Sequence, residues 1–152
     1  GEGTMRLMKR RLRFSVLLAT AVIAGCAGRT DVKASAADPL KDTRWQLAKI
    51  EYMDDTTVKP DDPGKYTLAF DAQGKVSIQA DCNRMSGTYT FSAPSGLEFG
   101  PLISTRAACP PESLYNRLAN DLPDIRSFVI KDGDLHLALM VDGGIYHFTP
   151  MP

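Results

Sequence analysis

The sequence predicts a mainly β domain, namely a small antiparallel barrel or strongly curved sheet of about eight strands, with one α-helix before the last three strands. Two observations predict this class. Apolar and polar residues alternate in short runs, which is the period-2 pattern of half-buried strands. Gly, Pro and Asp separate these runs at short intervals, which favours antiparallel neighbours. A single run with helical spacing interrupts the strands.

The first half of the predicted domain contains four alternating runs. Residues 66–70 and 76–80 each place apolar side chains on one face, and the Asp-Ala-Gln-Gly sequence at 71–74 predicts a tight turn between them. Residues 87–92 alternate in the same way, and residues 97–99 follow an Ala-Pro-Ser-Gly turn. These runs predict four short strands.

An earlier strand is expected at residues 45–52, where the apolar side chains change face. Trp45 and Leu47 share one face, whereas Ile50 and Tyr52 share the other. A β-bulge between the two pairs would reconcile them, so we expect an irregular strand here.

One helix is expected between positions 110 and 123. Leucines recur at helical spacing at positions 114, 118 and 122. Pro110 and Pro111 are expected in the first turn, where a missing N–H costs little, and Pro123 is expected to end the helix. We expect the helix to plug one end of the barrel or to pack across an open side.

Three strands are expected to follow the helix. Residues 128–131 and 134–139 flank Asp132-Gly133, which is a strong signal of a two-residue hairpin. An Asp-Gly-Gly turn then leads into residues 145–149, which complete the domain.

Residues 1–25 are interpreted as a short remnant followed by a lipoprotein signal peptide. Residues 1–4 resemble a cloning remnant or upstream read-through, so that Met5 or Met8 is the true start. Four basic residues at positions 9–13 precede an apolar run that is shorter than the roughly 20 residues of a membrane span. Small residues then lead into Cys26, in a pattern similar to the bacterial lipobox. We expect a lipid on Cys26; the alternative is a plain secretory signal.

The rest of the chain is divided into a tether and a domain. Residues 26–42 are small and polar and are interpreted as a lipidated flexible tether, and residues 43–150 as the folded domain. The expected partner is the membrane, reached through the lipid on Cys26. Because Ala27 and not Asp follows this cysteine, the expected location is the bacterial cell envelope, at the outer membrane and facing the periplasm.

The charge balance argues against nucleic acid as a partner. The whole chain has 18 basic and 18 acidic residues. Five of the basic residues but only one of the acidic residues fall within residues 1–25, so the remainder has a net charge near −4. Binding to phosphate backbones requires a basic face.

Four groups of motifs resemble the META-domain family, the HslJ-like proteins of bacterial envelopes. They are Thr-Arg-Trp-Gln-Leu at 43–47, Asp-Cys-Asn-Arg-Met-Ser-Gly-Thr-Tyr at 81–89, Thr-Arg-Ala-Ala-Cys at 105–109, and the closing hairpin at 135–137 and 145–148. The resemblance covers residues 43–149 and implies a β-barrel-like fold with one helix and a heat-shock or envelope-stress context. It implies structural roles for Trp45, Asn83, Gly87, Thr105 and Arg106, and no catalytic residue.

Cys82 and Cys109 are expected to form a disulfide, because two cysteines in an oxidising compartment usually pair. The bridge would close a loop of about 28 residues. Two alternatives remain: buried free thiols, or a redox site in which Arg84 and Arg106 favour a thiolate.

A turn is expected around Asn83, Ser86 and Gly87, because Asn tolerates left-handed geometry and bonds its own backbone. The alternative is a polar ligand site at the edge formed by Asn83 and Arg84.

Metal, cofactor and catalytic chemistry are not expected. His136 and His147 each stand alone in a strand, without a carboxylate or cysteine at metal-ligand spacing. The loop from 53 to 64 holds four aspartates but lacks the EF-hand pattern, so a solvated loop is expected. The motifs of hydrolases, zinc proteases and phosphate-binding loops are missing from the sequence.

The expected function is a non-enzymatic binding or structural role in the envelope, in which the protein binds an envelope partner. The alternatives are a barrel that binds a small ligand in its mouth, and a hydrolase or thiol-redox enzyme with a dispersed site. A filled interior with an exposed patch or strand edge would favour the partner-binding module.

Overall fold

The computed structural model describes residues 35–141 and 143–152. The predicted signal peptide, the lipidation site Cys26 and the first part of the tether lie outside these residues. The described chain forms ten strands, one α-helix and two 3₁₀ helices. In chain order they are β1 (Thr43–Glu51), β2 (Thr57–Val58), η1 (Pro63–Lys65), β3 (Tyr66–Phe70), β4 (Lys75–Ala80), β5 (Asn83–Ser92), β6 (Gly96–Phe99), β7 (Ile103–Ser104), α1 (Tyr115–Asp121), η2 (Leu122–Asp124), β8 (Ile125–Lys131), β9 (Asp134–Leu139) and β10 (Ile145–Pro150).

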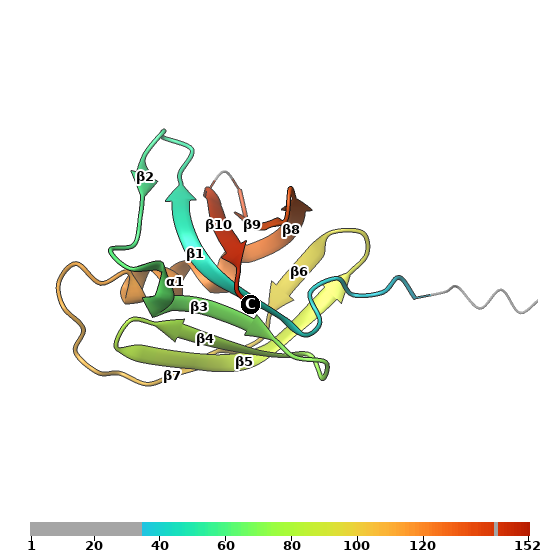
Figure 1. Ribbon diagram of the computed structural model, residues 1–152, viewed down its shortest axis with the longest axis horizontal. Helices are drawn as coiled ribbons and strands as arrows, with labels where there is room; N and C mark the ends of the chain where they lie inside the picture. The colour runs from blue at the N-terminus through green and yellow to red at the C-terminus, as the bar shows by residue number, and fades with distance from the viewer. Residues whose placement is uncertain (1–34, 142) are drawn as a thin grey trace, which may run out of the picture. The chain divides into compact units, whose positions relative to one another are not determined.

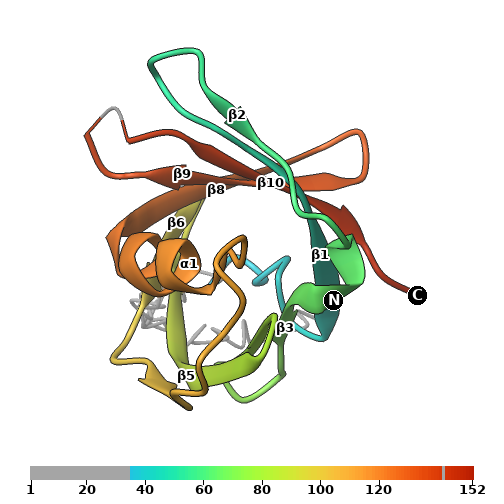
Figure 2. The ribbon, with the colours of Figure 1, turned by 90° about the vertical axis from the view of Figure 1, so that its left-hand side faces the viewer.

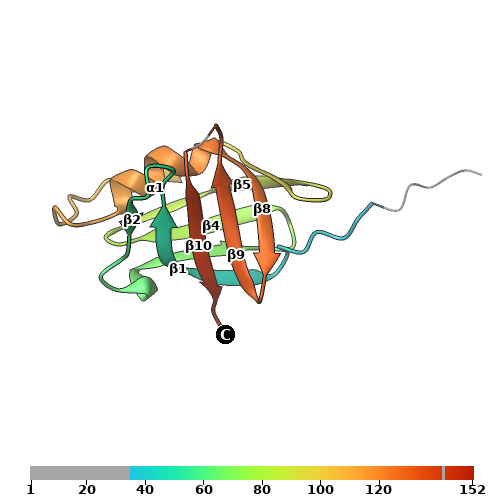
Figure 3. The same cartoon turned by 90° about the horizontal axis from the view of Figure 1, so that it is seen from above.

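Eight of the strands close into an antiparallel barrel, as the sequence predicts. Their order around the ring is β1-β3-β4-β5-β6-β8-β9-β10, and pairing of β10 with β1 completes it. Figures 1 and 3 show the two curved walls that these strands form. β2 pairs with the end of β1 and β7 pairs with the start of β5, so both lie outside the ring.

The ring has one narrow seam, between β6 and β8. These strands pair at a single position, Gly96 with Ser127, and a hydrogen bond of 2.9 Å from Phe128 N to Ser95 O supports it. The closing pair of β1 and β10 is far more extensive, with six paired positions. Closure therefore depends on the first and last strands of the domain.

The barrel interior is filled by side chains. Buried apolar residues from all eight ring strands and from α1 and η2 form one cluster. Aromatic rings fill its centre: Phe70 contacts Tyr89 at a centroid distance of 4.8 Å and Phe99 at 6.2 Å. Eight-stranded barrels have interiors of about the volume that side chains can fill.

β1 carries the predicted bulge. Its register against β10 shifts between Leu47 and Lys49. As a result Trp45, Leu47 and Ile50 are all buried, although their spacing does not fit a regular strand. The Trp45 indole packs in the core and donates a hydrogen bond of 2.8 Å to Thr43 Oγ1.

The helix lies where the sequence predicts it but begins later. Figure 2 shows α1 across one end of the ring. Its first residue is Tyr115, and the expectation that Pro110 and Pro111 form its first turn is wrong. They lie in a separate turn, closed by a hydrogen bond from Ser113 N to Pro110 O, because a residue before proline avoids the helical region. Leu118 and Leu122 are buried against the barrel core.

The folded domain begins earlier than residue 43. Leu40 is completely buried, and Asp38 accepts a hydrogen bond of 2.8 Å from the Tyr89 hydroxyl. Residues 38–42 therefore belong to the barrel and not to a tether. Burial, and secondly the bond to Asp38, raise the pKa of Tyr89.

The turn expected around Asn83, Ser86 and Gly87 is wrong. All three residues lie in β5, and the turn is formed instead by Asp81 and Cys82. Gly87 is explained by crowding: a Cβ there would lie 2.6 Å from Pro101 O and 2.9 Å from a Leu102 methyl. The chain from β6 to β7 thus crosses β5 at a distance that only glycine permits.

The substitution Gly87→Ala is expected to destabilise the barrel by about 2–3 kcal/mol, because the methyl group overlaps backbone that cannot move freely. Gly133→Ala is the matched control: its φ is +88°, but nothing lies within 4 Å of the added methyl. That control is expected to cost only the backbone strain of about 1 kcal/mol. Urea denaturation of both variants measures the difference. An equal or smaller loss for Gly87→Ala would contradict the crowding argument.

Candidate functional site

Asn83 is the one buried non-aromatic polar side chain among the described residues, and its amide is fully hydrogen-bonded. Its Oδ1 accepts from Ala107 N at 2.7 Å and from Thr105 Oγ1 at 2.9 Å. Its Nδ2 donates to Ala107 O at 3.0 Å. The amide therefore pairs with the backbone of Ala107 as a neighbouring strand would, and it ties the loop after β7 to the start of β5.

The disulfide lies beside this amide. Cys82 and Cys109 are bonded, with a Cα–Cα distance of 5.5 Å, so the predicted bridge is confirmed and the free-thiol alternative is wrong. Asn83 Nδ2 lies 3.2 Å from Cys109 Sγ and 3.5 Å from Cys82 Sγ. The bridge and the amide fasten the same loop at neighbouring points.

Thr105 completes this connection, and Arg106 does not take part in it. Arg84 N donates to Thr105 Oγ1, and Thr105 N donates to Arg84 O, both at 3.0 Å. Arg106 is exposed in the same loop. The two cysteine motifs of the sequence are thus one structural unit, joined across β5 and β7.

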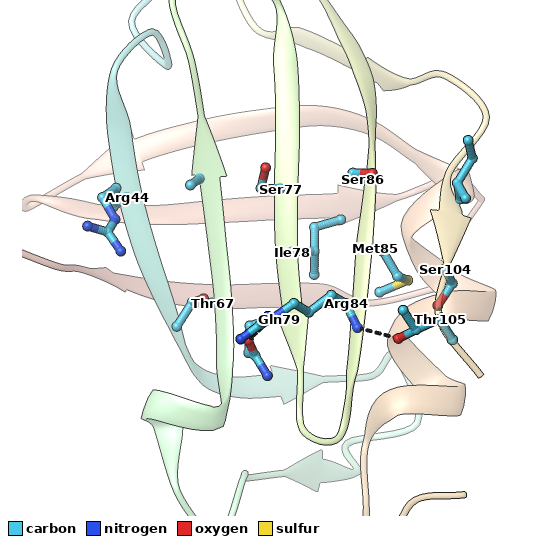
Figure 4. A pocket seen from close by; sticks show the side chains of 12 residues that line it. Arg44, Thr67, Ser77, Ile78, Gln79, Arg84, Met85, Ser86, Ser104 and Thr105 are labelled. Atoms are coloured by element: carbon cyan, nitrogen blue, oxygen red, sulfur yellow. Dashed lines mark hydrogen bonds between the residues drawn. The ribbon is translucent and has the colours of Figure 1, made fainter. Parts of the chain in front are cut away.

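An open groove with a volume of about 520 Å³ lies beside this unit, on the outer face of the sheet (Figure 4). Its floor follows one row of outward residues across five neighbouring strands. The middle of the row is small and its ends are large, which creates the hollow. In order, the row is Arg44, Ala69, Ser77, Ser86 and Ile103.

A second row forms one wall of the groove. Thr67 on β3 is paired with Gln79 on β4, which is paired with Arg84 on β5. Arg84 Nε donates to Gln79 Oε1 at 3.0 Å, and Gln79 Nε2 donates to Asp81 O at 2.7 Å. These bonds hold the Arg84 side chain along the wall, as Figure 4 shows.

The groove is positively charged. Arg44 and Arg84 are both exposed, and the twelve residues that line the groove include no carboxylate, histidine or cysteine. We call this feature the arginine-flanked groove. Ile103, which is 78% exposed, adds an apolar surface at its β7 end. Sequence reasoning identified Arg84 as an edge residue but not Arg44, because only the strand register brings the two onto one face.

A tyrosine–aspartate cluster fixes the other side of the helix. Asp121, at the end of α1, accepts hydrogen bonds from Tyr146 at 2.7 Å and from Tyr52 at 3.0 Å. Arg117 donates to the Tyr52 hydroxyl at 2.9 Å. Burial, and secondly the bond to Asp121, raise the pKa of Tyr146 far above its ordinary value. This cluster anchors α1 to the end of β1 and to β10. No local sequence pattern predicts it, because its residues are far apart in the chain.

The sequence analysis treated the two histidines as isolated, and the structure shows that they are not. His136 on β9 and His147 on β10 are cross-strand neighbours whose Nδ1 atoms lie 2.8 Å apart. Three of the four aspartates in the 53–64 loop have local partners: Asp54 accepts from Thr56 N, Asp62 accepts from Gly64 N, and Asp61 pairs with Lys65.

Two further observations concern metal binding and membrane spans in residues 35–141 and 143–152. In this part of the chain, the His, Cys, Asp and Glu side chains form no group of three or more that converges on a metal position. Its helices are all too short or too polar to cross a membrane.

The fold and the site define a class, that of small, closed antiparallel β-barrels with a filled interior, a helix across one end and a disulfide beside β5. The family profile of the META domain matches residues 38–150. The chain therefore belongs to the META-domain family, which confirms the resemblance found in the sequence.

Solved structures that are similar to this domain include the following two. A protein from Burkholderia xenovorans, solved by NMR, is 28% identical, with a TM-score of 0.62 over 80% of this chain and 96% of that chain. A DUF4847-family protein from Bacteroides vulgatus is 12% identical, with a TM-score of 0.54 over 73% of this chain and 94% of that chain; it shares the fold alone. No curated protein matches the chain.

Asn83→Ala is expected to destabilise the domain by about 3 kcal/mol with the disulfide intact, because it removes a buried amide together with its hydrogen bonds to the backbone of Ala107 and to Thr105 Oγ1. Gln79→Ala removes an amide of the same chemistry that is only partly buried, and is expected to cost about 0.5 kcal/mol. Urea denaturation gives the two losses, and hydrogen exchange of the Ala107 amide reports the loop directly. Equal losses in the two variants would show that the buried amide has no special role.

Proposed function

We propose that this protein is a lipid-anchored, non-enzymatic binding module of the bacterial cell envelope, and that the arginine-flanked groove is its binding surface. The observation that carries the proposal is the contrast between a filled barrel interior and an open, positively charged groove on the outer face. Small barrels that bind ligands in the mouth need an open lumen. Binding on the outer face is therefore favoured over a small-ligand barrel.

The proposed occupant is an acidic, extended peptide segment of an envelope protein. Arg44 and Arg84 offer guanidinium groups that pair with carboxylates, and no acidic residue lines the groove to compete. Exposed Ile103 offers a contact for an apolar side chain between such carboxylates. The combination of two cations and one apolar edge favours a peptide over a polysaccharide, which presents few apolar groups.

The envelope location rests on the cysteines. Cys26 follows the leader in a pattern similar to a lipobox, and the Cys82–Cys109 bridge suits an oxidising compartment. Together they support an anchor at the outer membrane with the domain in the periplasm. The proposal includes a role under heat or envelope stress, because the META-domain family is associated with such conditions.

The non-enzymatic role is supported by the lining of the groove. General acid–base and nucleophilic chemistry require His, Asp, Glu, Cys or an activated hydroxyl. The hydroxyls of Ser77 and Ser86 face the groove without a base among the residues that line it. A hydrolase or thiol-redox enzyme is therefore the less supported alternative.

The test uses an acidic probe peptide of alternating Glu and Leu and a variant in which both arginines are reversed, Arg44→Glu with Arg84→Glu. The affinity is expected to fall by at least tenfold for each reversed arginine, because charge-assisted hydrogen bonds are lost. Lys59→Glu, which changes the same charge at an exposed position outside the groove, is the control. NMR titration of the ¹⁵N-labelled protein measures affinity and is expected to map shifts onto β3, β4 and β5.

Three outcomes would overturn the groove as the peptide site. The shifts could map elsewhere, a control peptide with Gln in place of each Glu could bind equally well, or Lys59→Glu could weaken binding as much as the double reversal. Binding of an acidic polysaccharide without binding of the peptide would replace the proposed occupant.

Replacement of the first cysteine, Cys26→Ser, is expected to release the protein from the membrane fraction of bacterial cells that express the full chain. The wild-type protein is expected to begin at Cys26 and to carry the mass of an added diacylglycerol. The variant pair Cys82→Ser with Cys109→Ser is the control and is expected to stay membrane-bound. Cleavage at another residue, or wild-type protein in the soluble fraction, would refute the anchor.

A further inference from the structure

Two histidines face each other on the outer wall formed by β9 and β10. His136 and His147 are directly paired across these strands, and their rings are nearly perpendicular with centroids 4.8 Å apart. Their Nδ1 atoms are separated by 2.8 Å. The same outward row continues to Val129 on β8 and to Lys49 on β1. The barrel's register thus brings two imidazole nitrogens close enough to bind one metal ion that lies beside the line joining them.

The proton count of this pair is restricted. A hydrogen bond between two Nδ1 atoms needs one protonated nitrogen and one bare nitrogen. Glu51 Oε2 lies 2.6 Å from His147 Nε2, although its approach is too oblique for a formed hydrogen bond. A carboxylate in this position favours a proton on Nε2 of His147, which leaves its Nδ1 bare and directed at His136.

We propose that His136 and His147 bind a divalent late transition metal, Cu²⁺ above all, through their two Nδ1 atoms. Two nitrogens bound at about 2.0 Å and at 90° to each other lie about 2.8 Å apart, whereas a tetrahedral angle would separate them by about 3.3 Å. The observed separation of 2.8 Å fits the square-planar or tetragonal geometry that Cu²⁺ and Ni²⁺ prefer. Water completes the remaining positions, because the described residues supply no third convergent ligand.

The charged groups around His147 favour its role as a metal ligand. Burial, opposed by the nearby Glu51 carboxylate, lowers the pKa of His147. The hydrogen bond from Lys49, 2.6 Å from Glu51 Oε1, lowers the pKa of Glu51 and keeps it ionised. A carboxylate behind a ligating histidine fixes its tautomer and raises its basicity. When the metal binds, the Nδ1 proton of His136 moves to its own Nε2 through solvent.

The site is independent of the proposed peptide groove, since none of its residues lines that groove. The experiment is a Cu²⁺ titration of the full chain, purified with its disulfide intact and without a histidine tag. Calorimetry of the wild-type protein and of His136→Asn with His147→Asn measures the affinity. We expect the double variant to lose one equivalent of Cu²⁺, and Glu51→Gln to bind at least about tenfold more weakly. Arg44→Glu, which lies in the groove, is expected to leave Cu²⁺ binding unchanged.

A spectroscopic measurement on the wild-type protein removes the dependence on variants. Electron spin echo spectroscopy of the Cu²⁺ complex counts bound imidazoles, and two are expected. Fewer than two imidazoles, or an unchanged stoichiometry in a folded double variant, would overturn the proposal and leave the histidines as a hydrogen-bonded pair. A thermal melt of the double variant without metal confirms that it is folded.

Discussion

The buried amide of Asn83 is the contact on which the arrangement of the barrel end depends. The loop that it holds, through the backbone of Ala107, is the only connection between β7 and the helix. A loop without regular pairing must bond its backbone N–H and C=O groups to side chains or to water. Asn83 supplies both an acceptor and a donor to one residue of that loop. The disulfide at Cys109 then limits how far the chain can move before it enters the helix.

A second polar anchor, at Asp121, holds the far end of the helix. α1 has seven residues, too few to be stable by propensity alone, so its position must come from tertiary contacts. Leu118 is buried against the core, and the two tyrosine hydroxyls bound to Asp121 fix its angle. The helix is thus held by polar contacts at both ends and by apolar packing between them. This arrangement closes one end of the barrel.

The sequence predicts those parts of the fold that local chemistry determines. The Asp132-Gly133 hairpin, the bulge in β1 and the alternating strands follow from short-range rules, and the structure confirms them. Asn83 was misassigned because asparagine in a turn and asparagine in a buried strand look alike in sequence. The histidine pair was missed for a different reason. Residues 136 and 147 meet only because β9 and β10 adopt one particular register.

Register is therefore the property that links the fold to its outer surfaces. Because side chains fill the interior, the proposed binding sites lie on the outer face. Each of them is formed by one row of side chains that runs across neighbouring strands. The row from Arg44 to Ile103 and the row that contains His136 and His147 each combine side chains from several strands. A slip of one residue would turn either row inward. Asn83 stands at the first pair of the β4–β5 hairpin and fastens the loop after β7 to β5, so the amide that holds the chain before the helix also supports the strand pairing beneath the groove.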